Sequence, residues 1–307
     1  MKKNTSNKYL FRRAVVLIFV MGLVALVIGI AYHQKTADKQ KYEATKLEAE
    51  KLKKQEQKKQ EEEANAAQAK EAQLAEQKKF EEAIAGTGKS TPIKILMYHA
   101  IDYSSKGDEL FIPKEKFREE MKYIKDQGFN TISLDELYSN IVDGKALPEK
   151  PIVITIDDGY QNSYKNAYPV LKEFDMKAAV FMITSFIDKI PCLGSDEMRE
   201  MDKNGVTIES HTVTHRKLNE LSYAEQKAEL KDSKEALEKV LGRKVNYLAY
   251  PSGKFNNDTL ALDKELGYTM ALSTINGIAD KSNGIYKLKR IYVSNNYSLD
   301  YFKKLVK

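Results

Sequence analysis

The stretch PIVITIDDGY, residues 151–160, leads an apolar run directly into two adjacent carboxylates. An uninterrupted apolar and β-branched run is typical of a strand buried on both faces, as in parallel sheets. In parallel α/β folds, chemistry takes place just beyond the carboxyl ends of the strands. Asp157 and Asp158 stand at such a place, where one carboxylate can bind a metal and the other can act as a general base. Asp-Asp-Gly also fits an ordinary turn, so the rest of the chain must distinguish these readings.

Strand and helix patterns alternate on both sides of this stretch. Strands are expected at residues 93–98, 131–134, 152–156, 178–184, 206–210, 245–250, 270–273 and 288–293. Helices are expected at residues 114–127, 134–141, 162–174, 195–204, 223–241, 258–266 and 298–307. The clearest start signal is Ser222 with Glu225, a capping box. Alternation repeated about seven times predicts a parallel sheet, most simply a (β/α) barrel or a variant of one.

Residues 14–32 carry no charge and follow a basic tail, residues 1–13. As a helix rising about 1.5 Å per residue, this run just spans a bilayer core of roughly 30 Å. The preceding basic residues predict a cytoplasmic N-terminus and a catalytic part outside the cell. The alternative is a signal peptide cleaved after the small residues Gly29 and Ala31. The run exceeds the usual signal length of about 7–15 residues, which favours an uncleaved anchor.

Residues 33–90 are expected to form a charged helical stalk and linker. Lys, Glu, Gln and Ala dominate residues 35–85, and pairs such as Glu50 and Lys54 have the spacing of ion pairs on one helix face. The apolar positions are too sparse and irregular for a sustained heptad, so a coiled coil is only weakly indicated and the oligomeric state stays open. The globular domain is expected to occupy residues 91–307.

Charge and cysteine content exclude some classes of function. The net charge of +6 is concentrated in the N-terminal tail, and residues 35–85 are balanced. The globular part is nearly neutral and has no electrostatic footprint for nucleic acid. The single cysteine, Cys192, excludes an intrachain disulfide and a cysteine-based zinc cluster.

Three histidines stand at predicted strand ends: His99, His211 and His215. The last two are four residues apart and can share a metal if the chain turns helically after the strand. Asp158 would add a carboxylate to this pair. Two histidines and one carboxylate form a catalytic type of metal site with positions open for water and substrate. The alternative is that both histidines are cap or surface residues.

Three motifs carry a family resemblance. IDDGY at 156–160, HTVTH at 211–215 and AYPSG at 249–253 resemble, in this order, motifs of the polysaccharide deacetylases of carbohydrate esterase family 4. The resemblance covers about residues 93–293. It implies a distorted (β/α) barrel of about seven strands that removes acetyl groups from N-acetyl sugars.

The resemblance also implies residue roles. Asp157 matches the general base. Asp158, His211 and His215 match the ligands of a divalent metal, for which Zn²⁺ is expected.

In the third motif, Tyr250, Pro251 and Ser252 match the substrate contacts. The backbone N–H near Ser252 matches an oxyanion contact.

The chain departs from the family pattern at the group that orients the base. Many members have an arginine where this chain has Ala249. Arg290, on a late strand, is a candidate substitute that would orient Asp157 and border the substrate. The alternative for Arg290 is an ordinary surface ion pair.

A second departure concerns the general acid, because no histidine follows His215. LMYH at 96–99 ends the first strand in a Tyr-His pair. This resembles a subgroup, including poly-N-acetylglucosamine deacetylases, in which an early histidine is the acid. His99 is therefore the expected acid, and a buried structural histidine is the alternative.

The expected substrate follows from location. An exported domain on a stalk should act on an N-acetylated wall or surface glycan, releasing acetate. Peptidoglycan, poly-N-acetylglucosamine and the linkage region of a wall polysaccharide all fit. The alternatives to an enzyme are an inactive glycan-binding module and a membrane-anchored wall scaffold.

Overall fold

The computed structural model describes residues 5–86, 91–102 and 108–307. The helices are α1 Thr5–Gly86, α2 Lys114–Asp126, α3 Leu134–Asp143, α4 Tyr168–Glu173, α5 Ser195–Lys203, α6 Tyr223–Leu241, α7 Asn257–Glu265 and α8 Leu299–Val306. The strands are β1 Lys94–Tyr98, β2 Ala100–Ile101, β3 Phe111–Ile112, β4 Asn130–Thr131, β5 Pro151–Ile156, β6 Ala178–Met182, β7 Val206–Ser210, β8 Tyr247–Ala249, β9 Met270–Asn276 and β10 Leu288–Tyr292. The chain divides into two compact units, Met1–Ala69 and Lys70–Lys307.

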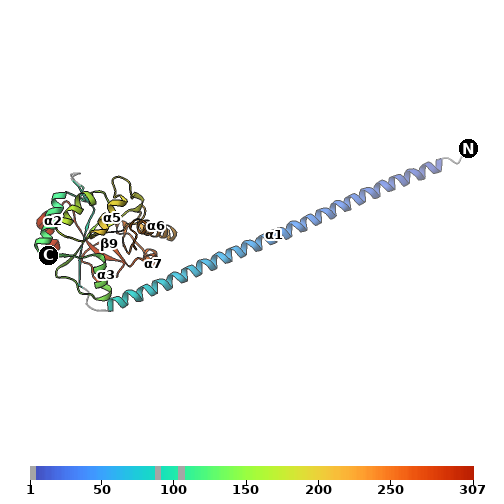
Figure 1. The fold of residues 1–307 in the computed structure, drawn as a ribbon. Coiled ribbons are helices and arrows are strands. Elements are labelled where there is room, and N and C mark those ends of the chain that lie inside the picture. The colour runs from blue at the N-terminus through green and yellow to red at the C-terminus, as the bar shows by residue number, and fades with distance from the viewer. Residues whose placement is uncertain (1–4, 87–90, 103–107) are drawn as a thin grey trace. The chain divides into compact units, whose positions relative to one another are not determined.

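Parallel strands form a closed barrel in the second unit. Seven of them follow one another in the order β1-β5-β6-β7-β8-β9-β10, and the ring closes because β1 pairs with both β5 and β10. Helices surround these strands (Figure 1). The predicted (β/α) barrel is confirmed. Because the strands are parallel, their carboxyl ends share one rim, and this rim holds the side chains singled out above.

The barrel is distorted between β5 and β6. β6 pairs with the last two residues of β5, whereas β4 pairs with its first two. β5 and β6 therefore pair only near the carboxyl-end rim. At the other end of β5, the short strand β4 pairs with it in place of β6. The expected strand at 131–134 is wrong in extent. Its later residues lead into α3, where Ser133 and Glu136 form a capping box.

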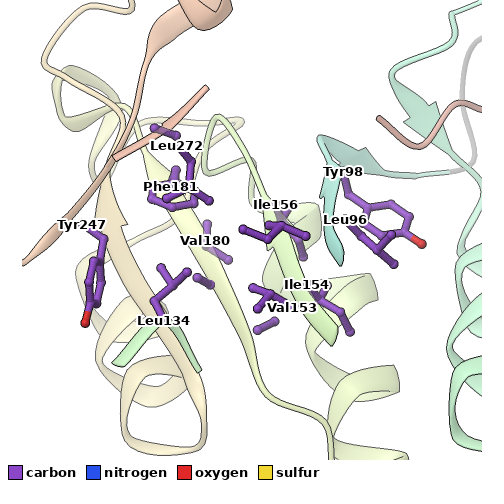
Figure 2. Close-up of a cluster of buried hydrophobic side chains, with 14 of the residues drawn as sticks. Leu96, Tyr98, Leu134, Val153, Ile154, Ile156, Val180, Phe181, Tyr247 and Leu272 are labelled. Carbon is purple, nitrogen blue, oxygen red and sulfur yellow. The ribbon is translucent and has the colours of Figure 1, made fainter. Parts of the chain in front are cut away.

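The core lies on both sides of the strands. β5 is buried from its second residue onward, as its apolar run predicted. Tyr98 faces the helix layer, where its hydroxyl donates a hydrogen bond to Glu120 of α2 at 2.9 Å. Figure 2 shows Leu96 and Tyr98 pointing away from Phe181 and Leu272. The alternation of side chains along each strand thus separates an outer layer under the helices from the barrel interior.

The segment after Asp-Asp-Gly differs from the single helix expected at 162–174. It begins with a π-helical turn, Ser163–Ala167, and continues as α4. The regular ladder is interrupted where Pro169, near the start of α4, has no N–H to donate.

Two other strand boundaries differ from expectation. β8 is shorter than the predicted 245–250, because side chains take the backbone N–H groups before it: Glu238 accepts from Val245 at 3.1 Å and Glu209 from Asn246 at 3.2 Å. β9 runs beyond the predicted end at 273. The small parallel sheet β2–β3 was not predicted.

α1 runs without a break through the predicted anchor, residues 14–32, and into the predicted stalk. Part of it is long and apolar enough to cross a membrane, and none of the side chains described in its most apolar stretch is buried. The boundaries assigned to tail, anchor and stalk stay predictions. Residues 87–90 of the expected linker lie outside the described part of the chain.

Replacing Gly159 with alanine should destabilise the barrel more than the same change at Gly205. Both have left-handed backbones, with φ of 71° and 87°, so each substitution should cost about 1–2 kcal/mol in backbone strain. Only at Gly159 would the new Cβ meet another group, the Sδ of Met182 at 2.1 Å and its Cα at 3.2 Å. We expect a further loss of about 1–3 kcal/mol for Gly159→Ala in urea unfolding of the chain. Equal losses would show that Met182 moves aside freely.

Candidate active site

Asp157 and Asp158 follow β5 at the carboxyl-end rim, where the backbone bends sharply. Asp158 and Gly159 both have left-handed backbones, with φ of 73° and 71°. The bend sends the two carboxylates to different surroundings: Asp157 is 2% exposed, and the side chain of Asp158 is 14% exposed. Asp-Asp-Gly is therefore a turn, as one reading had it, and this turn gives each carboxylate its own set of partners.

His211 follows β7 directly, and the loop to His215 is not helical. The expected helical turn is wrong. The chain bends instead through left-handed residues, Thr212 with φ of 66° and His215 with φ of 60°. Glu229 of α6 holds the bend by accepting from two backbone N–H groups of the loop, at 2.9 and 2.8 Å. The two imidazole rings still meet, with centroids 4.8 Å apart.

Side chains complete the seam between β7 and β8. The backbones pair through Ser210 opposite Leu248. Glu209 accepts from two backbone N–H groups at the beginning of β8, at 3.2 and 3.1 Å. His211 Nδ1 lies 2.7 Å from the carbonyl oxygen of Ala249, which can only accept. The Nδ1 proton is thereby fixed, and in a neutral ring Nε2 keeps a free lone pair.

Asp158, His211 and His215 form a group that fits a metal ion. Asp158 Oδ1 lies 3.5 Å from His211 Nε2 and 3.6 Å from His215 Nε2. One ligand atom from each residue lies within 4.8 Å of the others. Ligand atoms about 2.0–2.1 Å from a tetrahedral Zn²⁺ would lie roughly 3.4 Å from one another. The donor set and its spacing therefore suit one divalent cation.

The electrostatics of this group also favour positive charge. Burial lowers the pKa of His211, but the carboxylates of Asp158 and Asp157 outweigh it, and the net shift is upward. Burial raises the pKa of Asp158, but His211 outweighs it, and the net shift is downward. Burial and the charge of His211 lower the pKa of His215, which keeps this second imidazole neutral. A neutral imidazole is the form that binds a metal.

Asp157 is held by Arg290 from β10. The guanidinium donates from Nη1 to Oδ1 and from Nη2 to Oδ2, both at 2.7 Å. It also donates to Thr155 Oγ1 at 3.1 Å and to the carbonyl oxygen of Ser273 at 2.9 Å. Arg290 is fully buried, so the alternative of a surface ion pair is wrong.

This pairing determines the charge of Asp157. Burial raises the pKa of the carboxyl, but the charge of Arg290, followed by that of His211, lowers it to about 2. Asp157 is therefore ionised at neutral pH. Arg290 takes one acceptor site on each oxygen and leaves others for a further proton donor.

His99 stands between β1 and β2 at the same rim. Burial lowers the pKa of its imidazole, while Asp157 and Asp158 act in the opposite direction. Its Nδ1 is buried and has no hydrogen-bond partner among the described residues. Its ring packs edge-on against Tyr292, with centroids 6.3 Å apart. The charges of both carboxylates therefore act on His99, and its Nδ1 bonds to neither.

The AYPSG segment adjoins the group through Ala249, which accepts from His211. Tyr250 and Pro251 are buried, whereas Ser252 is exposed and left-handed, with φ of 52°. Gly253 is also left-handed, and a Cβ there would lie 2.0 Å from Thr274 Oγ1. The backbone N–H of Ser252 has no acceptor in the part of the chain that the structure describes.

Sequence reasoning missed several supporting residues. Thr155 lies two places before Asp157, so period-two alternation puts both on the interior face. Glu209 precedes His211 by the same spacing. Both could have been found from this spacing. No local signal indicates that Ser273 or Glu229 supports the site.

Together these groups suit the hydrolysis of an acyl bond. One rim brings together four groups from strand ends and loops. They are a group that can bind a cation, the ionised carboxylate of Asp157, the imidazole of His99 and the unpaired backbone N–H of Ser252. The functional residues expected from the three motifs and from His99 are all present there. Their catalytic roles stay predictions.

Comparisons with known proteins find similar sequences in one family. A family model described as polysaccharide deacetylase matches residues 144–271, which include both aspartates and the His211–His215 loop. The Bacillus subtilis (strain 168) protein YxkH, whose name places it among the polysaccharide deacetylases, is 38% identical over 224 residues, covering 72% of this chain and 79% of that protein. A poly-β-1,6-N-acetyl-D-glucosamine N-deacetylase of Staphylococcus aureus (strain MRSA252) is 26% identical over 210 residues, covering 64% and 71%.

Solved structures show the same fold. The Streptococcus pyogenes deacetylase PplD, in complex with acetate, has 32% sequence identity and a TM-score of 0.68. The match covers 71% of this chain and 100% of that chain. Motifs, barrel and relatives lead to one conclusion: the chain belongs to the polysaccharide deacetylase family.

Proposed function

We propose that the chain is a metal-dependent N-deacetylase acting on N-acetylglucosamine units of a cell-wall or surface polysaccharide, from which it releases acetate. The observation that carries the proposal is the Asp158–His211–His215 group beside the ionised, buried Asp157. Family membership supports the reaction class. The substrate class is supported by the Staphylococcus aureus relative, which is named for poly-β-1,6-N-acetyl-D-glucosamine.

Asp158, His211 and His215 would hold the cation, and nitrogen and oxygen donors of this kind suit Zn²⁺. When bound, such a cation polarises a carbonyl and lowers the pKa of water, which counters the low reactivity of an amide. His211 is set for this role by the bond from Nδ1 to the carbonyl of Ala249, which leaves Nε2 free.

Asp157 would take the proton of the attacking water. Its low pKa keeps the carboxylate ionised, and Arg290 fixes the direction of both oxygens. A weak base can serve when the proton it receives has itself been made more acidic. In this proposal Arg290 takes the part of the arginine that Ala249 replaces.

His99 would give a proton to the nitrogen of the leaving glucosamine. Burial acts against the protonated form of its imidazole and lowers the pKa overall, whereas the charges of Asp157 and Asp158 favour that form. The N–H of Ser252 would donate to the oxyanion that forms as water adds to the acetyl carbon. Tyr250 and Pro251 would shape the turn that presents this N–H.

The part of α1 that is long and apolar enough to cross a membrane supports a surface location. We infer a single-pass anchor with the basic tail in the cytoplasm and the barrel outside, within the wall. The charged part of α1 beyond the anchor, about 1.5 Å per residue, would then act as a spacer. An anchored deacetylase of this kind acts on polymers within its reach, so the partner is an N-acetylated glycan.

The full chain in detergent with Zn²⁺ should release acetate from at least one of three substrates: peptidoglycan fragments, N-acetylglucosamine oligomers or isolated wall polysaccharide. Free acetate and new primary amines measure the reaction. Saturable glycan binding without acetate would instead identify an inactive binding module. Chelation should abolish release and restored metal should recover it, whereas activity in verified metal-free protein would contradict the metal role.

Substitution of Asp157 and of Asp158 should affect metal binding differently. Asp157→Asn should lower kcat/KM by about 10²–10⁴-fold and retain bound metal, because Asp157 bonds to Arg290 rather than joining the ligand group. Asp158→Asn should lose both activity and metal. Metal content of the purified variants, measured beside acetate release, checks this. Loss of metal in both variants would contradict the division of roles.

The effect of His99→Gln should depend on the substrate, because some leaving groups must be protonated and others need no proton. On the N-acetyl glycan we expect a loss of about a hundredfold. On 4-nitrophenyl acetate the phenolate leaves unprotonated, so the rate should change little. Asp157→Asn is the matched control and should impair both reactions. Equal losses of His99→Gln on both substrates would contradict the acid role.

A further inference from the structure

The turn that carries the Ser252 N–H is held by a buried side chain. Ser252 and Gly253 are both left-handed, with φ of 52° and 65°, so the turn requires support from its surroundings. Tyr250 provides it. The ring is fully buried and stacks on Phe255, with centroids 4.8 Å apart. Its hydroxyl reaches the segment before β10 and helix α7.

The hydroxyl of Tyr250 is within hydrogen-bond distance of two oxygens. One is the backbone carbonyl of Tyr286, at 2.9 Å, and the other is Oδ2 of Asp263 in α7. A phenol has one proton, and a carbonyl oxygen can only accept. If Asp263 were ionised, two acceptors would compete for that proton, and one close oxygen pair would have no hydrogen between its atoms.

A proton on Asp263 removes this conflict. The carboxyl O–H then donates to the Tyr250 oxygen, and Tyr250 donates its own proton to Tyr286. Each of the two contacts then contains one hydrogen. Both hydrogen bonds point the same way, from Asp263 of α7 to the Tyr250 hydroxyl and from this hydroxyl to the carbonyl oxygen of Tyr286. The proton count therefore favours the neutral acid.

The surroundings of Asp263 also favour a neutral carboxyl. Asp263 is fully buried, and burial raises its pKa to about 8, with only the bond from Tyr250 acting in the opposite direction. Tyr250, which follows β8, contacts Asp263, and the charge of Asp263 acts on Tyr268, before β9. Tyr286, before β10, contacts both of these tyrosines. Lys234 of α6 lies over the ring of Tyr268, 4.7 Å from its centroid. Burial lowers the pKa of Lys234, and the charges of Glu238 and Glu209 act in the opposite direction.

We propose that Asp263 is a neutral carboxylic acid in the working protein, and that its hydrogen bond to Tyr250 keeps the Ser252 turn in the conformation that presents its N–H. Asp263 is thus a positioning residue, which acts through Tyr250. The second half of this inference rests on the proposed function, in which the Ser252 N–H binds the oxyanion. The first half does not.

The protonation of Asp263 is tested by heat unfolding of the full chain in detergent between pH 5 and pH 9, for wild type and Asp263→Asn. Asparagine keeps a donor to Tyr250 and does not titrate. The folded-state pKa of about 8 lies above the unfolded value of 3.8, so wild type should lose stability as pH rises between these values and level off above pH 8. The unfolding temperature of wild type should fall relative to Asp263→Asn over this interval. A constant difference would overturn the neutral acid.

The positioning role is tested by acetate release below pH 8. Asp263→Asn should stay within about twofold of wild type, because the donor remains. Tyr250→Phe keeps the stacked ring but removes the hydroxyl, and Asp263→Leu removes the acid. Both should lower kcat by about 10–100-fold with little change in KM, since an oxyanion donor acts in the transition state.

Each result decides one part of the inference. Unchanged kcat in Tyr250→Phe, or an equal loss in Asp263→Asn, would overturn the positioning role even if the unfolding data support a neutral acid. If wild type releases no acetate from any glycan, the proposed function and the positioning role fail together. The unfolding comparison needs no substrate, so it still decides the protonation of Asp263. Tyr250→Phe serves if Asp263→Leu does not fold.

Discussion

The bidentate ion pair between Asp157 and Arg290 is the constraint on which the site depends. Two charges withdrawn from water are stable only when their geometry is good and their remaining hydrogen bonds are made. Arg290 meets both conditions inside the barrel, with bonds to Asp157, Thr155 and the carbonyl of Ser273. One side chain of β10 thereby connects groups of β5 and β9. Because Asp158 follows Asp157 in the chain, the same pair also sets where the metal-binding group can form.

Tyrosine–carboxyl contacts extend this control from the interior to the helix layer. Tyr98 ends β1 just before His99 and donates to the fully buried Glu120 of α2. Tyr250 follows β8, just before the Ser252 turn, and meets the fully buried Asp263 of α7. In both places a strand end that carries a candidate catalytic group is tied to a surrounding helix by a phenol and an acid. Loops at the rim are thus positioned from outside the barrel as well as from within it.

Sequence reasoning predicted the barrel and the meeting of Asp158, His211 and His215, because the ends of parallel strands converge whatever the loops do. It failed where the outcome depended on loop conformation or on distant side chains. The histidine pair meets through left-handed residues that a four-residue spacing does not reveal. Arg290 could be named as a partner of Asp157, but its complete burial depends on β9 and β10 closing the ring beside β1. The short β4 depends on where β5 and β6 diverge, which the sequence of β4 alone does not encode.

The left-handed residues of the site have a consequence for how the protein would mature. Among the described residues, seven non-glycine residues have positive φ, and four of these belong to the rim: Asp158, Thr212, His215 and Ser252. Each holds a conformation that a free chain seldom adopts, so ordering these residues costs free energy when the barrel folds. Coordination of a cation would offset part of that cost. Metal binding and folding of the rim would then be coupled, and bound metal would raise the stability of the folded chain.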